Sequence, residues 1–195
     1  MGRLAIVVGI PGVGKTTVMD NFVETCQRRG IKARVLTMGT LMLEEAVVRG
    51  LAQDRDGLRG LTLKQQRELR EASVPKILGA KREAAIVLLD THFMVRSRGG
   101  YLIALPRRFL ESISPESFVI VEAAVDEIVR RRNKDKKRTR DVIDRSEVKL
   151  EQDITRQAAF LLASLCNADA IRVLNRRKQA AQAAGKLYEF LLEGA

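Results

Sequence analysis

Hydrophobic positions along the chain alternate between short continuous runs and longer amphipathic stretches. The continuous runs are rich in Val, Ile and Leu, which is typical of strands that are covered on both faces of a parallel sheet. We expect strands at residues 3–9, 33–36, 86–90, 117–122 and 170–174. Because helical patterns separate these runs, the β-α-β order predicts an α/β fold with a doubly wound parallel sheet. No internal repeat or linker interrupts the pattern, so we expect a single domain over residues 1–195.

The amphipathic stretches predict the helices that connect these strands. A helix over 63–83 should begin with a capping box, because Thr62 is followed three residues later by Gln65. Pro75 lies inside that stretch, where its missing N–H should kink or split the helix. The other expected helices cover residues 15–29, 41–51, 127–132, 147–166 and 179–192.

A glycine-rich loop follows the first strand directly. Residues 9–16 read Gly-Ile-Pro-Gly-Val-Gly-Lys-Thr and match G-x-x-x-x-G-K-[ST] at every fixed position. Glycines let the backbone fold around a phosphate with N–H groups inward, and the following helix adds its dipole. This pattern predicts a P-loop that binds ATP, with Lys15 on the β- and γ-phosphates and Thr16 as a ligand of Mg²⁺. The predicted ATP-binding residues are Gly9, Ile10, Pro11, Gly12, Val13, Gly14, Lys15, Thr16 and Thr17.

An aspartate ends the apolar run Ile-Val-Leu-Leu-Asp at residues 86–90. Parallel sheets bind their ligands at the carboxyl ends of strands, where Asp90 would lie. We therefore predict Asp90 as the second protein ligand of Mg²⁺. The alternative is an aspartate that only caps the end of the strand.

Positive charge is concentrated in one segment. The chain has 35 Lys and Arg against 24 Asp and Glu, a net charge of +11, and residues 130–140 include eight basic side chains. Such a cluster suits a solvated helix end, a nucleic-acid patch, or a mobile lid whose arginines close over phosphates. Aromatic residues that would stack on bases are absent from it, which argues against nucleic acid. We favour the lid, because fixed guanidinium groups stabilise a phosphoryl group in transfer.

Two further features bear on where the protein works. Cys26 and Cys166 are isolated from each other, so we expect free thiols in a reducing compartment. No apolar run reaches the ~20 residues of a membrane span, and the first run is too short for a signal peptide. We expect a cytoplasmic protein.

The order of these features resembles the archaeal type of adenylate kinase, over nearly the whole chain. The resemblance rests on GIPGVGKTT at 9–17, MGTLMLEEA at 38–46, RDGLRGL at 55–61, DTHFMVRSRGGYLIALP at 90–106 and RRNKDKKRTRD at 131–141. It implies the reaction ATP + AMP ⇌ 2 ADP with Mg²⁺. It also implies a P-loop kinase fold, with a parallel five-stranded sheet flanked by helices, an AMP-binding helical region at roughly 38–84 and a short lid at 131–141.

The same resemblance implies roles for particular residues, and an association into trimers. The lid lacks the four cysteines of zinc-stapled lids, so we predict no structural zinc. We expect His92 to hydrogen-bond or pack rather than act as a base, because a phosphate acceptor is already ionised near neutral pH. The implied AMP-binding residues are Thr40, Arg55, Arg59, Thr91 and His92, and the implied catalytic residues are Lys15, Arg131, Arg138 and Arg140.

The sequence leaves two alternatives for the function. A kinase for another nucleoside monophosphate, shikimate or a sugar acid would share the ATP site and differ in the acceptor pocket. The chain departs from the family pattern at Ser97-Arg98 and Ile103-Ala104, near the expected AMP pocket. A nucleotide-dependent RNA-binding protein would instead use the net charge of +11.

Overall fold

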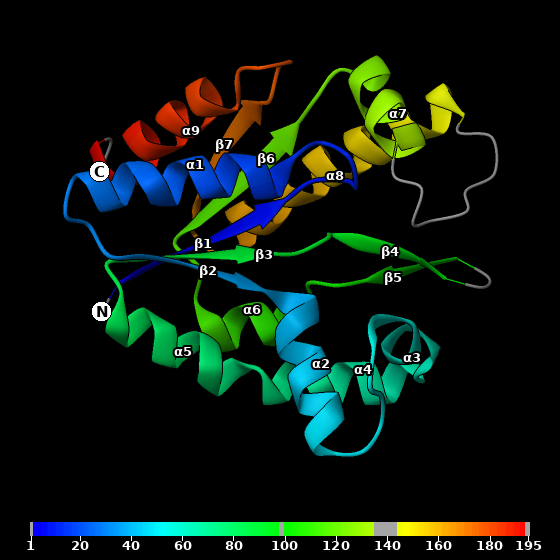
Figure 1. Ribbon diagram of the computed structural model, residues 1–195. Coiled ribbons are helices and arrows are strands. Elements are labelled where there is room, and N and C mark those ends of the chain that lie inside the picture. Colours follow the sequence, from blue (N-terminus) through cyan, green and yellow to red (C-terminus); the bar gives the residue numbers. More distant parts are fainter. Residues whose placement is uncertain (1, 98–99, 135–143, 194–195) are drawn as a thin grey trace.

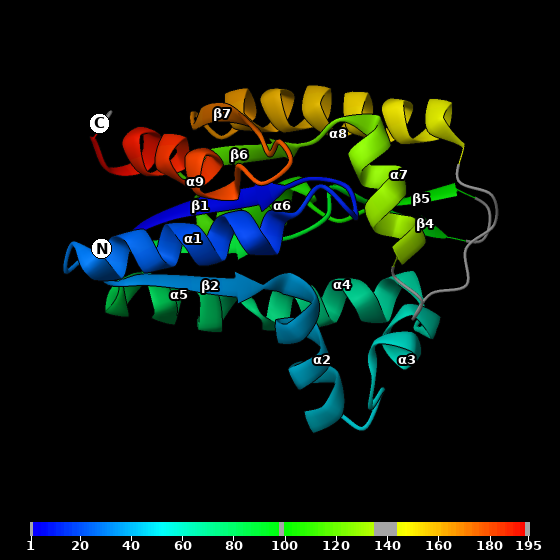
Figure 2. The ribbon, with the colours of Figure 1, turned by 45° about the horizontal axis from the view of Figure 1, so that its top comes forward.

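A computed structural model describes residues 2–97, 100–134 and 144–193 and places a parallel sheet between two layers of helices (Figures 1 and 2). The strand order is β2-β3-β1-β6-β7, and each neighbouring pair is parallel. Every strand that the sequence predicts is present, which confirms the α/β fold. The strands are β1 (Arg3–Val8), β2 (Ala33–Thr37), β3 (Ile86–Asp90), β6 (Ser117–Glu122) and β7 (Asp169–Leu174).

Each face of the sheet carries its own hydrophobic core. Successive side chains of a strand point to opposite faces. Leu4 and Ile6 of β1 therefore join one core, while Ala5 and Val7 join the other. The first core is closed by α2 (Met38–Val48), α4 (Leu63–Ala72), α5 (Val74–Glu83), α6 (Arg107–Ile113) and α8 (Arg145–Leu165). The second is closed by α1 (Lys15–Arg28), α7 (Val125–Lys134) and α9 (Ala180–Tyr188).

The predicted helix over 63–83 is split in two, as expected. The capping box of α4 is formed, with the Gln65 N–H donating to Thr62 Oγ1 at 3.3 Å and the Thr62 N–H donating to Gln65 Oε1 at 3.0 Å. Ser73 separates α4 from α5, and Pro75 lies in the first turn of α5, where its missing N–H costs nothing. Helix α2 begins at Met38, earlier than the predicted start at residue 41.

Several short elements are absent from the sequence prediction. Helix α3 (Arg55–Gly60) has six residues, two of them glycine, so its helical signal is weak. Its start is fixed by Asp54, whose Oδ1 accepts from the Gly57 N–H at 2.7 Å. The others are the antiparallel pair β4 (Met94–Ser97) and β5 (Gly100–Ile103), helix α6, and a π-helical turn, η1 (Glu189–Glu193). Among the helices described, none has both the length and the apolar content to cross a membrane.

The two cysteines are free thiols in different surroundings. Cys26 on α1 is fully buried, and burial raises its pKa to about 11, although Arg29 opposes the shift. Cys166, just after α8, is only partly buried, although burial and the charge of Glu111 raise its pKa as well. Because a reagent can reach Cys166 but not the enclosed Cys26, we expect a thiol reagent at about pH 8 to label Cys166 in the folded protein and Cys26 only after unfolding.

Titration of thiols with and without denaturant measures this difference. The matched control is Cys166→Ser, which should remove the signal of the folded protein. Fast labelling of folded Cys166→Ser would contradict the burial of Cys26.

Candidate functional site

The carboxyl ends of the parallel strands meet at one edge of the sheet, where α/β proteins bind ligands. Strand β1 leads into Gly9, the first residue of the P-loop. Asp90 at the end of β3 pairs in register with Val7 of β1 and with Thr37 of β2. Asn175 directly follows β7 at the same edge. The sheet therefore brings the P-loop, a carboxylate, a hydroxyl and an amide together.

The P-loop owes its shape to glycines. Gly12 and Gly14 have φ of 96° and 89°, a region that other residues rarely adopt. A Cβ atom on Gly14 would lie 2.4 Å from Asn175 Nδ2, so no larger residue fits there. Gly14 is also the N-cap of α1 and provides no side-chain cap. The first N–H groups of α1 are therefore left for an anion.

Side chains from distant elements hold the P-loop by its carbonyl oxygens. Arg131 Nη1 and Asn175 Nδ2 each donate to Val13 O at 2.8 Å. Arg132 Nε donates to Pro11 O, also at 2.8 Å. These bonds fix the shape of the loop from its carbonyl groups, and the Val13 N–H adds a bond within the loop to Ile10 O at 3.4 Å. A loop held in this way suits a phosphate cradle, in which N–H groups point toward the anion.

Lys15 lies buried where the loop meets the end of β3. Its side chain is 7% exposed, and its Nζ donates to Gly9 O at 2.8 Å and lies 3.7 Å from Asp90 Oδ1. Burial lowers the pKa of Lys15, and the Asp90 carboxylate partly offsets this shift. Burial likewise raises the pKa of Asp90, against the opposing charge of Lys15. Asp90 Oδ1 has no hydrogen-bond partner among the described residues, so it keeps bonding capacity for a ligand.

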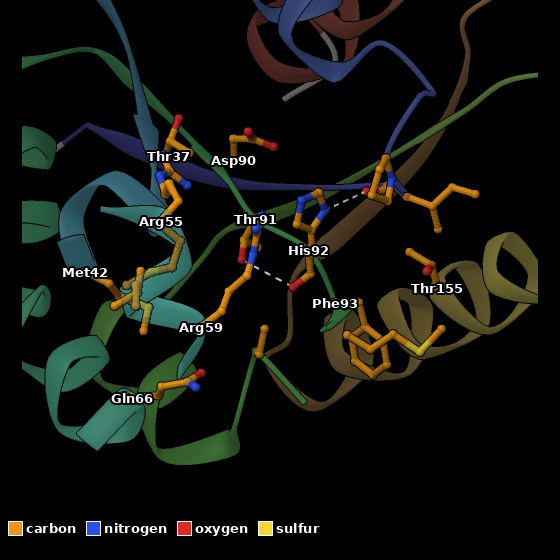
Figure 3. Close-up of a pocket in the computed structure, with 18 of the residues that line it drawn as sticks. Thr37, Met42, Arg55, Arg59, Gln66, Asp90, Thr91, His92, Phe93 and Thr155 are labelled. Carbon is orange, nitrogen blue, oxygen red and sulfur yellow. Dashed lines mark hydrogen bonds between the residues drawn. The ribbon is translucent and has the colours of Figure 1, made fainter. Parts of the chain in front are cut away.

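His92 lies next to this pair. Its Nδ1 is 3.2 Å from Gly9 O (Figure 3). The same atom is 3.4 Å from Lys15 Nζ. The imidazole therefore contacts both the P-loop backbone and the amine of Lys15. This geometry agrees with the expected hydrogen-bonding role of the side chain.

A cavity of about 480 Å³ opens beside the P-loop. Its walls come from the P-loop, the ends of β2 and β3, helices α2 to α4, and α8. Figure 3 shows Arg59 extending from α3 toward Thr91, with His92 and Phe93 beyond. The predicted site residues that line the cavity are Gly9, Ile10, Pro11, Arg55, Arg59, Asp90, Thr91 and His92.

Other predicted residues lie outside this lining. Thr40 on α2 accepts a hydrogen bond from Arg55 Nη2 at 2.8 Å and thereby positions a cavity arginine. Thr16 and Thr17 are exposed in the first turn of α1. Arg131 lies against the P-loop carbonyls instead of the cavity. Arg138 and Arg140, with most of the predicted lid, lie outside the described residues.

Some residues of the site were not predicted. Asn175 could have been found, because it follows a predicted strand as Asp90 ends one. Arg132 on α7 and Glu151 on α8 form an ion pair at 3.1 Å across the cavity wall, and a contact between two helices gives no sequence signal. Gln66 and Arg70 face the cavity from adjacent turns of α4.

The fold and the site define a P-loop kinase. A solved shikimate kinase from Acinetobacter baumannii in complex with shikimate superposes with a TM-score of 0.53 at 15% identity, covering 100% of this chain and 95% of that one. An APS kinase from Mycobacterium tuberculosis in complex with AMPPNP and APS gives 0.55 at 14% identity, covering 98% of both chains. At this identity the likeness establishes the fold alone. Residues 8–149 also match a family model described as an AAA domain.

Sequence relatives narrow the class. The adenylate kinase of Pyrococcus furiosus is 40% identical over 168 residues, which cover 86% of this chain and 84% of that protein. The adenylate kinase of Pyrococcus abyssi is 38% identical over a match that covers 98% of this chain and 96% of that protein. The adenylate kinase of Methanocaldococcus jannaschii is 35% identical, and the match covers 97% of this chain and 98% of that protein. The chain belongs to the adenylate kinase family and is thus an ATP:AMP phosphotransferase, as its sequence predicts. These relatives do not favour the alternatives of another acceptor or an RNA-binding protein.

The hydrogen bond from Asn175 to the P-loop can be tested with a matched pair of variants. Asn175→Ala removes a buried amide, and we expect a loss of about 1–3 kcal/mol in unfolding free energy. The loosened loop should also lower kcat/KM for ATP about tenfold or more. The control is Asn21→Ala, because Asn21 Nδ2 also donates to a backbone carbonyl at 2.8 Å, but at the exposed face of α1. Equal effects of both substitutions on kcat/KM would contradict a specific role of Asn175.

Proposed function

We propose that the P-loop and the cavity beside it bind the two nucleotides of the adenylate kinase reaction next to each other. The P-loop N–H groups, the N-terminus of α1 and Lys15 would hold the β- and γ-phosphates of ATP. The cavity would take AMP. The observation that carries this proposal is the position of Lys15 and Asp90, where the loop borders the cavity. A phosphoryl group held at Lys15 would face an acceptor in the cavity.

Thr16 and Asp90 would hold Mg²⁺. Asp90 fits this role, because its buried Oδ1 has no hydrogen-bond partner among the described residues. The described residues contain no cluster of three His, Cys, Asp or Glu that could hold a metal ion by themselves. Mg²⁺ does not require one, because it is commonly bound by one or two carboxylates together with substrate phosphates. When bound, the ion neutralises and orients phosphate oxygens.

Residues of the region 38–84, together with two residues that follow β3, would position the acceptor. Arg55, held by Thr40, and Arg59 would bind AMP from the side of α3, and Thr91 and His92 from the end of β3. An ionised phosphate needs no general base, so we assign His92 to hydrogen bonding. Catalysis would then depend on positioning and on charge stabilisation by Lys15 and by Arg138 and Arg140 of the lid at 131–141. Arg131, the first residue of that lid, lies in α7 and bonds to Gly12 O and Val13 O, so it would act by holding the P-loop.

Activity measurements test this assignment. We expect ADP to form from Mg-ATP with AMP much faster than with CMP, UMP, GMP or shikimate. Lys15→Met removes the buried charge and should lower kcat by about 10²–10³-fold, the usual loss for a group that stabilises the transition state. Lys32→Met, at an exposed lysine, is the control. Transfer to another acceptor in preference to AMP would overturn the AMP site, and unchanged kcat in Lys15→Met would overturn the phosphate site.

We also infer a homotrimer in the cytoplasm, by analogy with the family. The exposed apolar side chains of Leu161 and Leu165 on α8 are candidates for the subunit contact. Two free thiols suit a reducing compartment. Light scattering should give a mass near three times the 21.8 kDa of one chain. A mass of one chain would contradict the trimer.

A further inference from the structure

The cavity wall contains a buried cation that the assignments above leave without a role. Arg70 on α4 lines the cavity and is only 3% exposed. Within the part of the chain that the structure describes, its guanidinium forms no hydrogen bond and no ion pair, and its Nε is fully enclosed. Burial lowers the pKa of Arg70, and the charge of Arg67 adds to the shift. Arginine nevertheless stays protonated, so an unpaired positive charge is enclosed here.

Another buried cation of this protein, Lys81, does have partners within the chain. Lys81 is 2% exposed, yet its Nζ donates to Glu116 Oε1 at 2.8 Å and to Ser114 O at 3.1 Å. Burying a charge without such partners is costly, and natural proteins normally avoid it. The contrast between Lys81 and Arg70 indicates that the partner of Arg70 comes from outside the chain.

The other arginines of the cavity already have partners within the protein. Arg59 pairs with Asp56 at 2.6 Å, and Arg132 pairs with Glu151 at 3.1 Å. Arg70 therefore keeps the full bonding capacity of its guanidinium for a ligand. A guanidinium matches phosphate oxygens in both charge and geometry, whereas an uncharged base or ribose would leave the buried charge unbalanced.

We propose that Arg70 binds the phosphate of the acceptor nucleotide and thereby selects a nucleoside monophosphate over the uncharged nucleoside. This inference rests on the proposed function, in which the cavity is the AMP site. It adds to that function a binding residue on α4, one helix beyond Arg55 and Arg59 of α3.

The test compares Arg70→Met with Arg67→Met, an exposed arginine on the same helix that does not line the cavity. Loss of a charge-assisted contact should raise KM for AMP roughly ten- to a hundredfold in Arg70→Met. The KM for ATP should change by no more than about twofold, because the substitution removes no contact to ATP. Arg67→Met should leave both constants unchanged.

Two further readouts separate substrate binding from a structural role. Ligand-free Arg70→Met should melt at the same temperature as the unaltered protein or higher, because it loses an unpaired buried charge. Adenosine, as a competitor of AMP, should inhibit both proteins equally. Arg70→Lys, which keeps the charge without the planar fork, should lie between the two proteins in KM for AMP.

Three results would overturn the inference. A lower melting temperature with equal losses for ATP and AMP, in both Arg70→Met and Arg70→Lys, would make Arg70 structural. Weaker inhibition by adenosine would move its contact to the base or ribose. Unchanged KM for AMP in Arg70→Met, with the unaltered protein selective for AMP, would refute this inference alone. If the unaltered protein itself does not prefer AMP, the proposed function fails first.

Discussion

The burial of Lys15 between the P-loop and the end of β3 constrains the rest of the site. A lysine that is 7% exposed needs an acceptor, and it has Gly9 O at 2.8 Å. It also needs an opposing charge nearby, and Asp90 provides one because the β1–β3 register sets Val7 beside it. Parallel pairing of two largely buried strands is therefore what places a compensating charge beside the buried amine. Burial shifts the pKa of Lys15 down and that of Asp90 up, so an anion would favour the charged form of Lys15 and a cation that of Asp90.

Buried charges in this protein fall into two kinds. Glu122 at the end of β6 is buried but forms ion pairs with Arg156 of α8 and Arg172 of β7. These pairs link β6 to its two neighbouring elements. Asp90 and Arg70, in contrast, each have a buried polar atom without a hydrogen-bond partner in the described part of the chain, although Asp90 lies 3.7 Å from Lys15 Nζ. Since a buried polar atom without a hydrogen bond destabilises the folded chain, such atoms mark places where a ligand can compensate. Both line the cavity next to the P-loop.

The sequence predicted features that depend on neighbouring residues and missed those that depend on contacts between distant ones. The P-loop depends on eight consecutive residues, and the capping box at Thr62 on four, so their spacing alone was sufficient. Asp90 needed only the rule about strand ends. Helix α3 was missed because its glycines weaken the signal, although Asp54 caps it. The bonds from Asn175 and Arg132 to the P-loop join residues more than a hundred positions apart, and only the assembled sheet brings them together.

The position of Arg132 has a consequence for how the two substrates affect each other. Its guanidinium bonds to Pro11 O of the P-loop and to Glu151 of α8, and it lines the cavity as well. In the arrangement proposed above, one side chain would thus belong to the walls of both nucleotide sites. A change in its position on binding of one nucleotide would alter the surface that the other nucleotide contacts. Thermodynamic reciprocity would then make the effect of each nucleotide on the affinity of the other the same factor.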